Sequence, residues 1–137
     1  MKIVLDTNVL VAGLLTPFNA PGEIVRMTSA GILQLCYDAR ILSEYTGVLH
    51  RPKFNLNADY VEALLDQIKA GGHPVVGVPL HKPLLDTSDE PFLEIAIAGN
   101  AACLVSGNLK HYPHVNRQGV EILSPSDFLL FYRKQQK

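Results

Sequence analysis

Apolar residues along this chain alternate between short continuous runs and longer stretches with helical periodicity. The continuous or alternating runs predict five strands, at residues 2–5, 33–37, 75–78, 102–106 and 120–123. Apolar positions spaced three or four apart predict helices at residues 8–15, 21–30, 39–50, 58–70 and 90–98, with a last helix from Pro125. Asp38, Asn57 and Ser124 stand where N-caps are expected, and Gly31 where a helix should stop.

Strands and helices therefore alternate, which favours an α/β fold with a central, mostly parallel five-stranded sheet flanked by helices in a three-layer sandwich. The 137 residues fit a single domain, 1–137. In such folds the active crevice lies at the carboxyl ends of the strands. Polar residues that directly follow strands are therefore the first candidates for chemistry.

Composition and charge narrow the classes of function. The net charge is −1, so charge alone does not hold this chain on nucleic acid, and such a role needs a local basic patch or bound cations. No apolar run is long enough to span a membrane, and no secretory signal opens the sequence, so we expect a cytoplasmic protein. Cys36 and Cys103 lie in apolar stretches and are expected to be buried free thiols.

Oxygen-bearing side chains follow three of the predicted strands. Asp6 follows the first strand, Asp86 to Asp89 follow the third, and Ser106 and Asn108 follow the fourth. Asp89 shares a helical face with apolar residues, whereas Glu90 and Glu94 are expected to turn outward. Carboxylates without a His or Cys cluster indicate a hard cation, Mg²⁺ or Mn²⁺.

Glu44 does not follow a strand, because it lies within the predicted helix 39–50. It falls on the border of that helix's apolar stripe and can lean toward the sheet edge. Each candidate also has an ordinary structural interpretation: Asp6 and Asp89 as helix caps, Glu44 as a surface acid, and Ser106 and Asn108 as turn residues. Taken together, a cluster of acids at one sheet edge repels itself, which favours a bound cation.

Four segments together resemble the motifs of PIN domains. They are Asp6-Thr7-Asn8-Val9, Ser43-Glu44-Tyr45 with the following Arg51-Pro52-Lys53-Phe54, Asp86-Thr87-Ser88-Asp89, and Leu104-Val105-Ser106-Gly107-Asn108. Each motif is weak alone, but all four occur in the family's order and spacing over nearly the whole chain. The branch that the sequence resembles most is the toxins of bacterial toxin-antitoxin pairs, relatives of VapC-type toxins.

The resemblance implies roles residue by residue. Asp6, Glu44 and Asp89 match the family's catalytic, metal-binding acids, and Asn108 stands where many members have a fourth acid. The supporting positions that match are Thr7, Asn8, Asp86 and Ser106, of which Asp86 has the least certain role. His111 falls where relatives often carry another Asp, so no role transfers to it, and all five histidines are expected at the surface or in loops.

The activity implied is that of an endoribonuclease that hydrolyses RNA phosphodiester bonds with Mg²⁺ or Mn²⁺, as the toxin of a type II toxin-antitoxin system. One cation held by Asp6 and Asp89, and a second nearer Glu44, would assist hydrolysis. Arg51, Lys53 and Lys110 are candidates for phosphate contacts, as is Lys82. The resemblance further implies a small antitoxin partner and a homodimer. The Ile24, Val25 and Met27 positions offer an apolar helix face that is also explained as core.

Three other classes of protein share part of this pattern. A phosphotransferase of the haloacid dehalogenase type needs a second acid where this chain has Asn8. A receiver-type signalling domain needs a Lys after the last strand, where Ser124 and Pro125 stand. A PIN fold that has lost catalysis and acts only as a binding module remains the main alternative, because Asn108 replaces an acid.

Overall fold

A fully parallel sheet of five strands organises the molecule. We describe residues 1–136 from a computed structural model. The strands are β1 (Lys2–Leu5), β2 (Gln34–Tyr37), β3 (His73–Pro74), β4 (Leu104–Val105) and β5 (Ile122–Leu123). Their order across the sheet is β3-β2-β1-β4-β5, and each neighbouring pair is parallel. The predicted α/β fold with a mostly parallel five-stranded sheet is confirmed.

Six α-helices connect and cover the strands within residues 1–136. They are α1 (Thr7–Leu15), α2 (Ala20–Ser29), α3 (Ala39–Leu49), α4 (Ala58–Gly71), α5 (Glu90–Ala98) and α6 (Pro125–Gln135). Short 3-10 turns add η1 (Pro52–Phe54), η2 (Thr87–Asp89), η3 (Leu109–His111) and η4 (His114–Asn116). None of the helices in this part of the chain is both long and apolar enough to cross a membrane.

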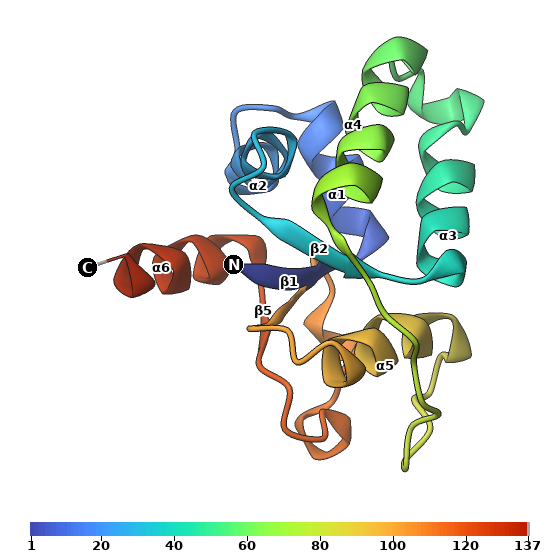
Figure 1. The fold of residues 1–137 in the computed structure, drawn as a ribbon, viewed down its shortest axis with the longest axis vertical. Coiled ribbons are helices and arrows are strands. Elements are labelled where there is room, and N and C mark those ends of the chain that lie inside the picture. Colours follow the sequence, from blue (N-terminus) through green and yellow to red (C-terminus); the bar gives the residue numbers. More distant parts are fainter. Residues whose placement is uncertain (137) are drawn as a thin grey trace.

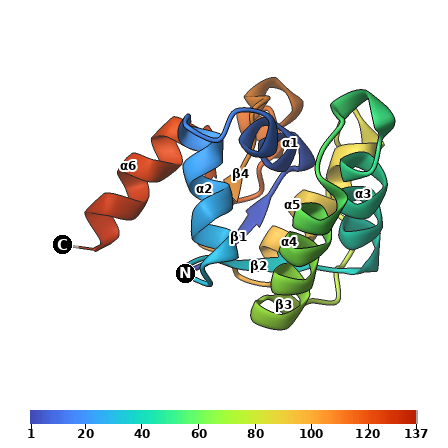
Figure 2. The same cartoon turned by 90° about the horizontal axis from the view of Figure 1, so that it is seen from above.

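The helices form a layer on each side of the sheet. Figure 1 shows α1 to α4 on one side and α5 on the other, and α5 packs against β1, β2 and β4. Seen from above in Figure 2, α6 lies beside α2 and projects away from the sheet. Apart from the first residues of β1 and β2, the three inner strands are buried on both faces, which explains the apolar runs Ile3–Leu5, Leu35–Tyr37 and Leu104–Val105.

Most of the predicted helix boundaries agree with the structure to within a residue or two. Asp38 accepts a hydrogen bond from the Ile41 amide, and Asn57 and Ser124 cap α4 and α6 in the same way. Gly31 follows α2 with φ 78°, a left-handed conformation that suits glycine at a helix stop. Ile24 and Val25 are core residues, and both cysteines are buried and free.

The third predicted strand, at residues 75–78, is wrong. The strand is instead β3 at His73–Pro74, and pairing with β2 extends only to the Val75 amide, which donates to the Tyr37 carbonyl. Val76 and Val78 are 90% and 68% exposed, so their alternation does not reflect burial. The fourth and fifth strands are also shorter than predicted, and the segment between them contains η3 and η4.

The strand order places a change of direction at the centre of the sheet. From β1 the chain proceeds outward through β2 to β3, then crosses back to β4 on the other side of β1. The carboxyl ends of β1 and β4 therefore adjoin while the segments that follow them diverge, which is where parallel α/β sheets bind ligands. This order also differs from the receiver-type order 2-1-3-4-5.

Candidate active site

Asp6 and Ser106 follow the two central strands and meet directly. The Asp6 amide donates to the Val105 carbonyl at 2.9 Å, which fixes the two strand ends side by side. The Ser106 hydroxyl then donates to Asp6 Oδ2 at 2.8 Å, and the Tyr112 hydroxyl donates to the same oxygen at 3.2 Å. Two donors converging on one carboxylate oxygen hold the Asp6 side chain in a single orientation.

Asp6 occupies the N-cap position of α1 without using its side chain as a cap. The structural explanation of this acid as a helix cap is therefore wrong. Its side chain is buried, and the loss of hydration raises its pKa, although the hydrogen bonds from Ser106 and Tyr112 act in the opposite direction. Asp6 is thus a buried acid held in place at an energetic cost.

Asp89 repeats this arrangement at the start of α5. It is 7% exposed, stands at the N-cap position, and makes no side-chain cap. Burial raises its pKa, and the nearby charges of Asp6 and Asp86 act in the same direction, whereas His111 lowers it. His111 Nδ1 lies 3.0 Å from Asp89 Oδ2, but this oxygen receives no well-directed hydrogen bond from residues 1–136.

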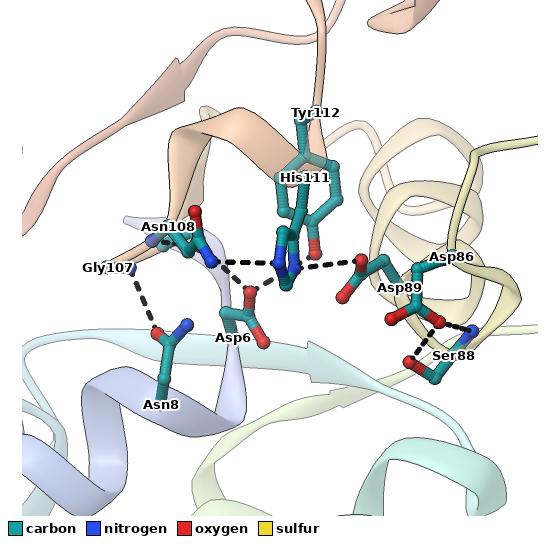
Figure 3. Close-up of polar contacts among 10 residues, drawn as sticks. Asp6, Asn8, Asp86, Ser88, Asp89, Gly107, Asn108, His111 and Tyr112 are labelled. Atoms are coloured by element: carbon teal, nitrogen blue, oxygen red, sulfur yellow. Dashed lines mark hydrogen bonds and ion pairs between the residues drawn. The ribbon is translucent and has the colours of Figure 1, made fainter.

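His111 connects Asp89 with the segment after β4. Its second ring nitrogen, Nε2, lies 2.8 Å from Asn108 Nδ2, as Figure 3 shows. An imidazole with its proton on Nδ1 satisfies both contacts, because Nε2 then accepts from the Asn108 amide and Nδ1–H faces Asp89. The Asn108 backbone amide also donates to the Ser106 hydroxyl at 3.0 Å, so one chain of contacts links Asp89, His111, Asn108, Ser106 and Asp6.

Glu44 reaches the site from α3 through Thr7. It is half-buried, as its position on the border of the apolar stripe predicts, and its Oε2 accepts a hydrogen bond from the Thr7 hydroxyl. Asn8 accepts a hydrogen bond from the Gly107 amide at 2.9 Å, which ties the start of α1 to the loop after β4. Thr7 and Asn8 thus link the three segments that carry Asp6, Glu44 and Asn108.

The remaining predicted site residues lie at the periphery. Asp86 is exposed, and its Oδ1 accepts from the Ser88 amide and hydroxyl, which lowers its pKa. Arg51, Lys53 and Lys110 are all exposed, as is Lys82. Arg51 lines the same groove as Glu44. Their proposed phosphate contacts remain predictions.

Two expectations for α5 are wrong. Glu90 does not turn outward, because its Oε2 accepts a hydrogen bond from the Leu84 amide at 2.9 Å. Glu94, only 12% exposed, pairs with Arg40 at 3.1 Å, and Arg40 also pairs with Asp38 at 2.7 Å. Helical phase alone located the apolar stripe, but it did not reveal that the preceding loop and α3 supply partners for these acids.

His111 and Tyr112 are the residues of this site that the sequence interpretation missed. All five histidines are exposed, as expected, yet exposure does not exclude His111 from the site. The available signal was its spacing, since a residue three positions after Asn108 lies on the same side of a 3-10 turn. Tyr112 is fully buried, and a buried tyrosine hydroxyl usually has a partner, here Asp6.

The donor set fits a divalent cation, although the coordination shell is incomplete as it stands. Asp6 and Asp89 are buried carboxylates without an Arg or Lys at ion-pair distance among residues 1–136, and Asp89 Oδ2 lacks a directed donor. Oxygen ligands of this kind suit Mg²⁺ or Mn²⁺. Over the same residues, no three His, Cys, Asp or Glu side chains converge closely enough to enclose an ion.

A cavity of about 760 Å³ lies elsewhere at the same sheet edge. It is lined by Tyr37, Leu42 and the segment after β3, and its charged side chains are the mutually paired Asp38, Arg40 and Glu94. It includes none of Asp6, Glu44 or Asp89. Because its charged side chains are already paired with one another, the acid cluster around Asp6 is the stronger candidate for a site that takes a cation.

Comparison with known proteins agrees with this geometry. A family model described as "PIN domain" matches residues 2–110, which include every predicted acid and the whole of β1 to β4. No curated protein matches the chain significantly.

Proposed function

Because this chain belongs to the PIN-domain family, whose members are generally nucleases, we propose that it is a Mg²⁺- or Mn²⁺-dependent endoribonuclease. Divalent metals are usual in this family. Membership of the family does not by itself identify the metal, the substrate or the residues, which are part of this proposal. Asp6, Glu44 and Asp89 are the catalytic acids of the proposal, with Asn108 as a weaker neighbouring ligand.

The single observation that carries the proposal is the pair of buried, unneutralised acids Asp6 and Asp89. Each stands at a helix N-cap position without capping it, and burial raises the pKa of each. Such acids cost stability unless a positive charge joins them. A structural role would call for a cap or an ion pair with Arg or Lys, so their arrangement is best explained by a cation and an anionic substrate.

The protein groups have distinct tasks in this proposal. Asp6 and Asp89 would hold the cation, which when bound would supply positive charge to the phosphate and lower the pKa of a water. Ser106 and Tyr112 orient Asp6, and His111 faces Asp89. Glu44, held by Thr7, lies on the α3 side of the cleft. In the hydrolysis, water oxygen bonds to phosphorus while the bond to the leaving ribose oxygen breaks.

The test is cleavage of a mixed single-stranded RNA by the purified chain with Mg²⁺ or Mn²⁺, with and without EDTA. Asp6→Asn is nearly isosteric, so it removes the charge while keeping the fold. We expect cleavage by the parent, its loss in EDTA, and its loss in the variant. Equal cleavage by parent and Asp6→Asn would overturn the assignment, and a parent that binds Mn²⁺ but cleaves nothing would favour the binding-module alternative.

We further propose that the chain is the toxin of a type II toxin-antitoxin pair, with a small antitoxin and a homodimeric form. The support is the resemblance of its motifs to VapC-type toxins. Expression of the parent should arrest bacterial growth, whereas Asp6→Asn should not. Growth unaffected by a parent that cleaves RNA in vitro would reject the toxin role and leave the nuclease intact. Light scattering tests the dimer.

A further inference from the structure

A groove with apolar walls opens beside the acid cluster, between α1, α3 and η1. Val11, Ala12 and Leu15 of α1 form one wall, and Val48 of α3 and Phe54 of η1 form the other. Leu15 is 48% exposed, and Val11, Val48 and Phe54 are half-buried. Apolar side chains that remain partly open to solvent in one concave surface are typical of a ligand site.

The groove is continuous with the proposed active site. Thr7, Asn8 and Glu44 line it together with the apolar residues. Thr7 donates to Glu44, and Asn8 accepts from the Gly107 amide, so the inner end of the groove is built from the same contacts that join α1, α3 and the loop after β4. A substrate whose phosphate lies at Asp6 can therefore place an adjoining nucleotide in this groove.

The outer rim of the groove is positively charged. Arg51 lines it directly, and the neighbouring Lys53 ammonium lies 5.1 Å from the centre of the Phe54 ring. No salt bridge involves Arg51 or Lys53 among residues 1–136. Cationic side chains next to a partly exposed aromatic ring complement a phosphate that adjoins a flat base, a combination typical of single-stranded RNA sites.

The dimensions favour a single nucleotide over a partner protein. The groove encloses about 490 Å³ and is lined by nine residues. That volume lies within the roughly 300–1,000 Å³ of small-ligand pockets. A standard protein interface uses about 20–30 residues on each side, more than this groove provides.

We infer that the groove formed by α1, α3 and η1, with Phe54 as its aromatic wall and Arg51 at its rim, binds a nucleobase next to the scissile phosphate of single-stranded RNA. This inference rests on the proposed ribonuclease function for the substrate's identity. Base contacts at Phe54, Val11 and Val48 would then set which nucleotide adjoins the cleavage point, since an apolar wall discriminates bases by shape and stacking.

The test is an amide NMR titration of the ¹⁵N-labelled chain with adenosine 5′-monophosphate, and separately with ribose 5-phosphate, which lacks only the base. Neither ligand contains a cleavable phosphodiester, so the result does not depend on nuclease activity. We expect the nucleotide to shift the amides of Val11, Leu15, Val48 and Phe54, and ribose 5-phosphate to leave them unchanged.

Three variants identify the contribution of the aromatic ring. Phe54→Leu retains apolar volume and should weaken nucleotide binding about tenfold, as expected for loss of base stacking. Phe54→Tyr should bind as the parent does. Phe18→Ala removes an aromatic side chain that is 96% exposed and does not line the groove, and it should change nothing.

Groove amides that respond equally to both ligands, or to neither, would overturn the inference, as would unchanged affinity in Phe54→Leu. Failure of the nuclease proposal gives a different result: RNA would remain uncut, while the base-dependent shifts and the Phe54→Leu effect would persist.

Discussion

Two groups of acids lie at the same edge of the sheet, and only one of them is paired with a cationic side chain. At β2, Asp38 caps α3 and pairs with Arg40 at 2.7 Å, and Glu94 pairs with the same guanidinium at 3.1 Å. Asp6, which follows β1, and Asp89, at the start of α5, do not cap a helix with their side chains. Of the basic residues in positions 1–136, only the exposed His111 approaches Asp89. We call these the Arg40 cluster and the Asp6 cluster.

The acids of the Arg40 cluster have a cationic partner inside the protein, whereas Asp6 and Asp89 have no Arg or Lys partner among residues 1–136. Every charged group of the Arg40 cluster has an opposite partner within the protein, because Asp38 and Glu94 share the Arg40 guanidinium. The acids of the Asp6 cluster are buried, and the negative charge of Asp6 further raises the pKa of Asp89. Their pKa values are raised by burial, whereas the Arg40 guanidinium gains two carboxylate hydrogen bonds that raise its pKa. We therefore expect substitutions in the two clusters to have different consequences.

The largest expected difference is in catalysis. Asp89→Asn removes a charge from the Asp6 cluster, and Glu94→Gln makes the matching change in the Arg40 cluster on the same helix. We expect kcat/KM for RNA cleavage to decrease at least about 100-fold in Asp89→Asn, because a cation ligand is lost. Glu94→Gln should remain within about threefold of the parent. Similar losses in both variants would remove the distinction between the clusters.

The next difference is in how stability depends on pH without a cation. A folded-state pKa above the ordinary value of 3.8 means that folded Asp6 binds more protons than the unfolded chain does. Its contribution is therefore most favourable below the ordinary pKa and decreases as the pH rises through the raised folded value. In EDTA, the unfolding free energy of the parent relative to Asp6→Asn should decrease as the pH rises from 3.8 through the raised folded pKa.

Urea unfolding at several pH values measures this dependence. A parent that gains stability relative to Asp6→Asn as the pH rises would show that Asp6 is stabilised rather than penalised in the folded chain.

A smaller effect is expected from the donors that hold Asp6. Tyr112→Phe removes the hydroxyl that donates to Asp6 Oδ2 at 3.2 Å, while the Ser106 donor remains. We expect a loss of about 1 kcal/mol in unfolding free energy, measured by urea titration, and a further rise in the pKa of Asp6. Carbon-detected NMR of the Asp6 carboxyl follows the second change, and a lowered pKa would contradict the assigned role.

The smallest effect is expected in the Arg40 cluster itself. Arg40 is 47% exposed, and ion pairs of that kind contribute about 0–1 kcal/mol. Arg40→Met should therefore cost no more than about 1 kcal/mol in thermal unfolding and leave RNA cleavage unchanged. A loss of cleavage would mean that the Arg40 cluster takes part in the chemistry.

Much of the fold was predictable from local sequence signals. The strand at Lys2–Leu5 is a continuous apolar run, and the caps Asp38, Asn57 and Ser124 fix three helix starts through side-chain hydrogen bonds with near neighbours. The third strand failed because pairing with β2 selects His73–Pro74, and neither residue has a strand-like apolar pattern. Edge-strand register depends on the partner strand, which local sequence does not contain.

The site residues that directly follow strands were predictable from the sequence. Asp6 and Ser106 were located because parallel strands bring their carboxyl ends together. The pairing of Glu94 with Arg40, and the contact of His111 with Asp89, depend on contacts between distant segments. Such contacts follow from tertiary packing, so helical phase and residue type did not reveal them.

Calorimetric titration with Mn²⁺ tests the central claim most directly, because it asks whether the Asp6 cluster binds the charge that the protein itself does not provide. The parent and Asp38→Asn should bind Mn²⁺ with similar affinity, and Asp6→Asn should lose measurable binding. Absence of binding by the parent, or equal binding by all three proteins, would contradict the assignment of Asp6 and Asp89 as the cation site.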